Sequence, residues 1–170
     1  MKKENRTKKL ALCAMLSAAA LILSYVEALI PFSLGIPGVK LGFANIAVVF
    51  ALYFLGGNYA LAVNIVRILL AGLLFGSPFS TLYALSGGMV SLAAMLLARK
   101  INRFSVTGVS MTGGVFHNLG QILVAAWVVH TPQIMFYYPL LIFSGVAAGI
   151  VNGITAQLCL RRMNYPERKR

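Results

Sequence analysis

Long apolar stretches separated by short polar ones make up most of the chain. They lie at residues 10–30, 41–56, 59–75, 79–98, 106–129 and 136–160. A helix needs roughly 20 apolar residues to cross the ~30 Å hydrocarbon core of a bilayer. The stretches at 41–56 and 59–75 are shorter than this, so they form either two spanning helices or one re-entrant hairpin. The pattern predicts an all-α membrane protein, a bundle of six transmembrane helices.

The overall composition agrees with a chain that is embedded in lipid. Of the 170 residues, 59% are hydrophobic and 11% are charged, and the mean hydropathy is +0.84. So few polar side chains cannot cover the surface of a water-soluble domain. No linker, repeat or low-complexity segment divides the sequence, which predicts a single integral membrane domain over residues 1–170.

The basic residues mark the borders of the apolar stretches. Apart from Lys40 and Arg67, the 15 Lys and Arg residues lie in three clusters, at 2–9, 99–103 and 161–170. Such clusters gather on the cytoplasmic side, so the sequence predicts a cell-membrane protein with both ends in the cytoplasm. Their partners are then anionic lipid headgroups and not nucleic acid. The first apolar stretch continues to Ile30, which favours a retained helix over a cleaved secretory signal.

Acidic residues are nearly absent, and this limits the chemistry open to the chain. The sequence has no Asp, and its acids are Glu4, Glu27 and Glu167. Diphosphate chemistry that uses Mg²⁺ needs clustered carboxylates, which these positions cannot supply. Cys13 and Cys159 belong to no CxxC or Cys/His cluster. The sequence therefore predicts no catalytic residue, no metal site and no cofactor.

Polar side chains inside the apolar stretches need a separate explanation. Arg67 lies in mid-stretch, where a charge costs about 2.5–3.5 kcal/mol. Either an ion pair with Glu27 or contact with a bound anion accounts for it. In the fifth stretch, His117 and Gln121 share one helical face with Asn118 beside it, which favours a ligand pocket. Hydrogen bonds between neighbouring helices are the alternative.

Small residues and turn residues indicate further contacts. Residues 35–45, which include Lys40 and Asn45, form either a lid over a cavity or an ordinary turn that leads into a helix. Ala14 and Ala18 are four residues apart, a spacing that suits either internal packing or docking of another protein. Glycines at every fourth position predict close packing of the last helix: Gly145, Gly149 and Gly153.

Taken in order, these motifs resemble those of the Gx transporter family, which is also labelled heptaprenyl diphosphate synthase component I. The resemblance rests on PGVKLGFANI at 37–46, Arg67, SGG at 86–88, and His117-Asn118 with Gln121, and it covers about residues 10–160.

The resemblance implies the fold and role of a substrate-binding S component of an energy-coupling factor (ECF) transporter. Such a component has six helices, an outward-facing pocket under its first loop, and an alanine motif that docks a membrane scaffold subunit driven by two ATPases. The expected ligand is a small vitamin-like or isoprenoid/quinone-related molecule with an anionic or electron-rich group. The expected ligand-binding residues are Arg67, His117, Asn118, Gln121, Lys40, Asn45 and Glu27, and the expected docking residues are Ala14 and Ala18. The second family label leaves an alternative, a non-catalytic accessory subunit of heptaprenyl diphosphate synthase.

Overall fold

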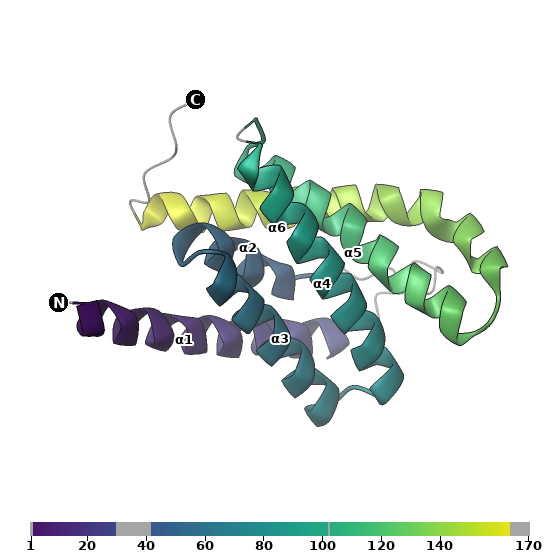
Figure 1. Cartoon of the computed structure of the whole chain (residues 1–170), viewed down its shortest axis with the longest axis horizontal. Coiled ribbons are helices and arrows are strands. Elements are labelled where there is room, and N and C mark those ends of the chain that lie inside the picture. Colours follow the sequence, from purple (N-terminus) through teal and green to yellow (C-terminus); the bar gives the residue numbers. More distant parts are fainter. Residues whose placement is uncertain (1, 30–41, 102, 164–170) are drawn as a thin grey trace.

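The structure, a computed structural model, describes residues 2–29, 42–101 and 103–163. These residues form α-helices and one short 3-10 helix, and no strand occurs among them (Figure 1). The α-helices are α1 (Lys2–Leu29), α2 (Ala44–Phe54), α3 (Gly57–Leu74), α4 (Pro78–Lys100), α5 (Val106–Val128) and α6 (Tyr138–Arg162), and the 3-10 helix spans Pro132–Tyr137. The all-α prediction is confirmed for the described residues.

Local sequence signals explain where several helices begin. Ser77 accepts a hydrogen bond from the N–H of Ser80 and Pro78 follows it, so α4 starts with a capping box and a proline that needs no donor. Ser105 caps α5 with its side chain, which accepts a hydrogen bond from the N–H of Gly108. Gly56 has φ +106°, a left-handed conformation that glycine adopts at low cost, and it turns the chain from α2 into α3.

Four helices of the described chain are long and apolar enough to cross a membrane. They are Arg6–Leu29, Gly57–Leu74, Pro78–Lys100 and the stretch Pro132–Arg162. α5 has 23 residues but is not among these four, and it carries several glycines together with hydroxyl, imidazole and carboxamide side chains. α2 has 11 residues and rises about 16 Å, roughly half of the ~30 Å hydrocarbon core. Of the six predicted spanning helices, four therefore have the length and hydropathy needed to cross a membrane.

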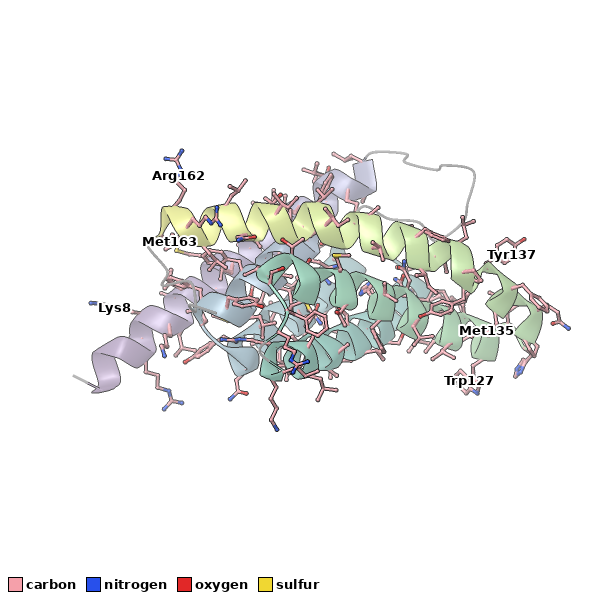
Figure 2. The ribbon with its side chains drawn as sticks, turned by 90° about the horizontal axis from the view of Figure 1, so that it is seen from above. Lys8, Trp127, Met135, Tyr137, Arg162 and Met163 are labelled. Carbon is pink, nitrogen blue, oxygen red and sulfur yellow. The ribbon has the colours of Figure 1, made fainter. Side chains whose placement is uncertain are left out.

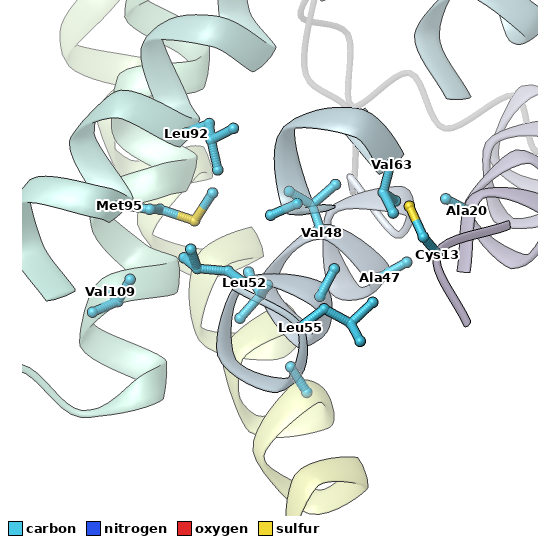
Figure 3. Packing of buried hydrophobic residues seen from close by; sticks show 14 of the residues in the cluster. Cys13, Ala20, Ala47, Val48, Leu52, Leu55, Val63, Leu92, Met95 and Val109 are labelled. Atoms are coloured by element: carbon cyan, nitrogen blue, oxygen red, sulfur yellow. The ribbon is translucent and has the colours of Figure 1, made fainter. Parts of the chain in front are cut away.

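The short helix α2 lies at the centre of the hydrophobic core. Its residues 47–52 are all buried, and the hydrophobic cluster around them includes side chains from α1, α3, α4, α5 and α6. Figure 3 shows α2 between these helices, with Leu52 close to Met95 and Ala47 on the side of α1. The other labelled members of the cluster are Cys13, Ala20, Val48, Leu55, Val63, Leu92 and Val109. A helix too short to span the bilayer is thus covered by protein.

Glycines bring α4, α5 and α6 into backbone contact. A Cβ atom added at Gly149 would lie 2.5 Å from the Cα of Met111, and one at Gly153 would lie 2.6 Å from the Cα of Thr107. Between α4 and α5, a Cβ at Gly120 would lie 2.8 Å from the carbonyl oxygen of Ser86. Without a hydrophobic force between helices in lipid, such close backbone approach is a main source of helix association. The predicted packing role of the glycine stripe on α6 is confirmed.

The surface of the described chain is apolar along its length and polar at one end. Large hydrophobic side chains such as Leu73, Phe136 and Phe143 are exposed, as expected for a surface covered by lipid. Figure 2 shows Lys8 and Arg162 at one end and Trp127 and Tyr137 at the other. The start of α1 and the end of α6 therefore lie at the same end of the molecule (Figure 1). This is the arrangement of a multi-pass membrane protein with basic residues at one border and aromatic residues at the other.

Candidate functional site

A buried arginine on α3 is the centre of the candidate site. Arg67 is 9% exposed, and its Nη2 donates hydrogen bonds to Oδ1 of Asn45 at 3.0 Å and to Oδ1 of Asn64 at 2.9 Å. Its Nε also donates to Oδ1 of Asn64, at 3.3 Å. Asn64 precedes Arg67 by three residues, so both side chains lie on the same face of α3. Asn45 is in the first turn of α2, and the guanidinium therefore joins the two helices.

Neutral amide oxygens hold this cation. Within the part of the chain that the structure describes, Arg67 has hydrogen bonds to carboxamides and no ion pair. Glu27 interacts with it electrostatically, but the Oε1 atom of Glu27 accepts a hydrogen bond from the N–H of Gly42 at 2.6 Å. The predicted pairing of Glu27 with Arg67 is thus an attraction through space, and the direct partner of the carboxylate is a backbone amide.

Gly42 connects this carboxylate to α2 and α6. Its carbonyl oxygen accepts from the N–H of Asn45 at 2.9 Å and from Nδ2 of Asn152 at 3.0 Å. Gly42 has φ +70°, and a Cβ atom there would lie 3.1 Å from Nδ2 of Asn45. Both the backbone conformation and the space therefore favour glycine. Asn152, on α6, is 3% exposed. Its hydrogen bond to Gly42 places a buried carboxamide of the last helix beside the start of α2.

The polar residues of α5 lie at two different helix interfaces. Asn118 donates through Nδ2 to the carbonyl oxygen of Leu141 at 2.7 Å and to Oγ of Ser144 at 3.2 Å, which ties α5 to α6. His117 and Gln121 lie against α4, where a Cβ atom at Gly87 would come within 3.1 Å of Cε1 of His117 and 2.8 Å of Cγ of Gln121.

The glycine pair of α4, Gly87 and Gly88, adjoins both His117 of α5 and Asn64 of the Arg67 cluster. The position after Gly87 is Gly88, where a Cβ atom would lie 2.7 Å from Nδ2 of Asn64. His117 and Asn64 therefore approach α4 at consecutive residues, one from α5 and one from α3. His117 and Gln121, which the sequence placed on one helical face, both meet α4, and Asn118 beside them meets α6.

The two predicted docking residues lie on the outer face of α1. Ala14 and Ala18 are exposed on α1, whereas Cys13 and Ser17 of the same helix face the interior. Lys40 is outside the described residues. Among the described residues, no group of three or more His, Cys, Asp or Glu side chains could hold a metal ion.

Two buried carboxamides of the cluster were not predicted from the sequence. Asn64 is 1% exposed and Asn152 is 3% exposed. Within the described residues, Nδ2 of Asn64 and Oδ1 of Asn152 are buried without a hydrogen-bond partner. Each Asn interrupts an otherwise apolar stretch, and Asn152 directly precedes a glycine of the packing stripe. Those two signals, a carboxamide in mid-helix and its place on a buried stripe, could have identified them.

Comparison with known proteins gives one match. The model of the family described as heptaprenyl diphosphate synthase component I matches residues 16–159. No curated protein and no solved structure matches the chain. The matched range contains every residue of the Arg67 cluster and covers well over half of the sequence. Together with the apolar helices, this shows that the chain is a membrane protein of the heptaprenyl diphosphate synthase component I family, also called the Gx family.

Proposed function

We propose that this chain is the substrate-binding membrane component of an ECF-type transporter and takes up a small vitamin-like or isoprenoid/quinone-related molecule. The observation that carries the proposal is the buried guanidinium of Arg67, which is surrounded by the carboxamides of Asn45 and Asn64 and has no ion pair among the described residues. A charge in mid-membrane is costly and marks a functional site more often than a purely structural one. A ligand with an anionic or electron-rich group would complete the shell of Arg67.

The unsatisfied carboxamide atoms support the same site. A buried donor or acceptor without a partner costs about 1–3 kcal/mol, so few persist in native proteins. Nδ2 of Asn64 and Oδ1 of Asn152 are two such atoms within the described residues, on helices that both contribute to the Arg67 cluster. We assign them, with Arg67, Asn45 and Glu27, to the ligand-binding region. His117, Gln121 and Asn118 line the adjoining interfaces of α5 in this proposal, and Lys40 belongs to the segment that precedes Gly42.

The exposed face of α1 supports an external partner. Ala14 and Ala18 are exposed, so neither is used for internal packing in the described structure. Two small residues one helical turn apart allow close approach of another helix. We assign them to docking of an ECF-type membrane scaffold subunit, which two cytoplasmic ATPases energise. In this proposal the chain itself carries out no catalytic step.

The orientation that this role requires is testable. We expect both ends of the chain to be cytoplasmic, since the basic residues gather at one end of the molecule. Single cysteines are placed at Arg103 and at Gln133, both exposed, in a variant without Cys13 and Cys159. Only the cysteine at position 133 is expected to react with an impermeant thiol reagent in intact cells of the source organism, and both react after permeabilisation. Labelling at position 103 before permeabilisation would reverse the orientation and contradict the transport proposal.

If Ala14 and Ala18 dock the scaffold subunit, bulky side chains at these positions of α1 should prevent the partner subunits from binding. In mild detergent, the wild-type protein is expected to retain a membrane scaffold subunit, two ATPases and a small molecule, all identified by mass spectrometry. Ala14→Trp and Ala18→Trp should lower recovery of the partner subunits by about tenfold or more, which corresponds to roughly 1.4 kcal/mol of lost association. Leu73→Trp is the control, since Leu73 is exposed on α3. Equal recovery from all three variants would remove the alanines from the interface.

The alternative function makes a different prediction for the same experiment. The family description names a component of a synthase, and an accessory subunit would use the same exposed face of α1 to hold an enzyme. Recovery of a prenyl diphosphate synthase without any ATPase would support a non-catalytic accessory subunit and contradict the transporter proposal.

A further inference from the structure

An unbroken chain of hydrogen bonds links α1 to the guanidinium on α3. It starts at Oε1 of Glu27, which accepts from the N–H of Gly42 at 2.6 Å. The carbonyl oxygen of Gly42 accepts from the N–H of Asn45 at 2.9 Å. Oδ1 of Asn45 then accepts from Nη2 of Arg67 at 3.0 Å. The position of the guanidinium is therefore connected, bond by bond, to the peptide group that precedes α2.

The Gly42 peptide is held from two sides by helices that share few other contacts. Glu27 on α1 binds its N–H, and Asn152 on α6 binds its carbonyl oxygen at 3.0 Å. α2 packs against both α1 and α6, whereas α1 and α6 have few contacts with each other. We call Glu27, Gly42 and Asn152 the Gly42 clamp. It joins α1 to α6 at the point where α2 begins.

We propose that Glu27 and Asn152 are positioning residues, which fix the start of α2 so that Asn45 presents its amide oxygen to Arg67. The two side chains act on one peptide group, and neither donates or accepts a hydrogen bond with Arg67. Asn152 is far from α2 and α3 in sequence, yet in this proposal it helps to position Asn45 and Arg67. This inference rests on the proposed role of Arg67 at a ligand site, but its test measures Arg67 directly and needs no ligand.

Three physical features support the clamp. The bond from Gly42 to Glu27 is short and its acceptor is charged, which makes it stronger than an ordinary amide hydrogen bond. A carboxylate near the first turn of a helix also interacts favourably with the helix dipole, and α2 has no side-chain cap of its own. Finally, the N–H of Gly42 is bound by Glu27, and its carbonyl oxygen accepts from both Asn45 and Asn152. Loss of Glu27 removes the bond of this peptide to α1, and loss of Asn152 removes its bond to α6, so either change should loosen the start of α2.

The accessibility of Arg67 tests this role. The full-length protein in detergent is treated with phenylglyoxal, which modifies guanidinium groups, and modification of Arg67 is followed by mass spectrometry relative to the exposed Arg162. We expect Glu27→Ala and Asn152→Ala each to raise the rate at Arg67 by about tenfold, the effect of losing one charged or well-formed hydrogen bond. Glu27→Gln keeps an acceptor without the charge, so its rate should fall between those of Glu27→Ala and the wild type.

The control separates positioning from general stability. Asn118→Ala removes hydrogen bonds to Leu141 and Ser144 at another buried interface, so it should lower the melting temperature and leave the rate at Arg67 unchanged. If Asn152→Ala does not fold, Asn152→Ser is used, and the same increase is expected. A rate at Arg67 within about twofold of the wild type in the folded Glu27 and Asn152 variants would overturn the inference, since that is under 0.5 kcal/mol. Absence of a co-purifying ligand or ATPase would instead refute the proposed function and leave this result intact.

Discussion

Arg67→Gln is expected to weaken binding of the small molecule that co-purifies with the wild-type protein by roughly ten- to hundredfold, because a hydrogen bond to a charged group contributes about 1.5–3 kcal/mol. The guanidinium is bound by two neutral carboxamides, Asn45 and Asn64, so its positive charge remains available to a ligand. Glutamine keeps one NH2 group as a hydrogen-bond donor and loses the charge. Isothermal titration of the purified protein measures the change, and Arg103→Gln, on the exposed loop between α4 and α5, is the control for loss of one positive charge.

The same substitution distinguishes a ligand-binding arginine from a structural one. Breaking a direct buried ion pair typically costs about 3–5 kcal/mol of stability. Oε1 of Glu27 accepts a hydrogen bond from Gly42, and Arg67 donates hydrogen bonds to carboxamides. We therefore expect Arg67→Gln to lose less stability than this. Thermal melts of Arg67→Gln, Glu27→Gln and the double variant give the coupling between the two residues. Unchanged ligand affinity in a folded Arg67→Gln protein would exclude Arg67 from the binding site, and full recovery of stability in the double variant would make it a structural partner of Glu27.

Gly149→Leu is expected to prevent stable folding, and Gly149→Ala to lower the free energy of unfolding by about 1–3 kcal/mol, the usual cost of overpacking. A Cβ atom at Gly149 would lie 2.5 Å from the Cα of Met111 and 2.8 Å from the carbonyl oxygen of Ser110. Both atoms belong to the backbone of α5, so no side-chain rotation relieves the contact. Only a separation of α5 from α6 makes room.

Gly108→Ala is the matched control for this prediction. Gly108 is also helical, but a Cβ atom there would lie 3.3 Å from the Phe104 ring, a side chain that can move. Alanine has the higher helix propensity by about 1 kcal/mol, so Gly108→Ala should be neutral or stabilising. Unfolding by sodium dodecyl sulfate, followed by circular dichroism, compares the two alanine variants. Equal stability of both would mean that the contact of α5 with α6 adjusts without cost.

The sequence was a good guide to the helices because lipid imposes a simple rule on them. Stretches long enough to cross a bilayer must satisfy their backbone hydrogen bonds internally, so apolar runs become helices. The described helices begin and end near the predicted stretches, although α1 starts at Lys2 because its basic residues also adopt helical conformation. Sequence length alone could not show that α2 is covered by neighbouring helices, since burial depends on which helices surround it.

The charged residues of the candidate site could be predicted from the sequence, but its neutral polar residues were harder to identify. Arg67 and Glu27 stood out because charges are rare in apolar stretches, and in the structure Arg67 binds Asn45 while Glu27 binds Gly42, just before α2. Asn64 and Asn152 are neutral and gave a weaker signal. The sequence placed Asn118 beside the face of His117 and Gln121, but it could not show which helix each side of α5 meets. Adjacent residues on a helix point about 100° apart, and the sequence does not reveal that α4 lies on one side of α5 and α6 on the other.

The polar side chains of α5 have a consequence for how the protein reaches the membrane. The insertion machinery accepts a nascent segment according to its apolar content, and α5 carries Thr, Ser, His, Asn and Gln side chains among its 23 residues. The backbone surfaces of its glycines match those of α4 and α6, which are both apolar enough to enter. We therefore expect α5 to leave the translocon together with a neighbouring helix, so that for this segment insertion and assembly are a single event.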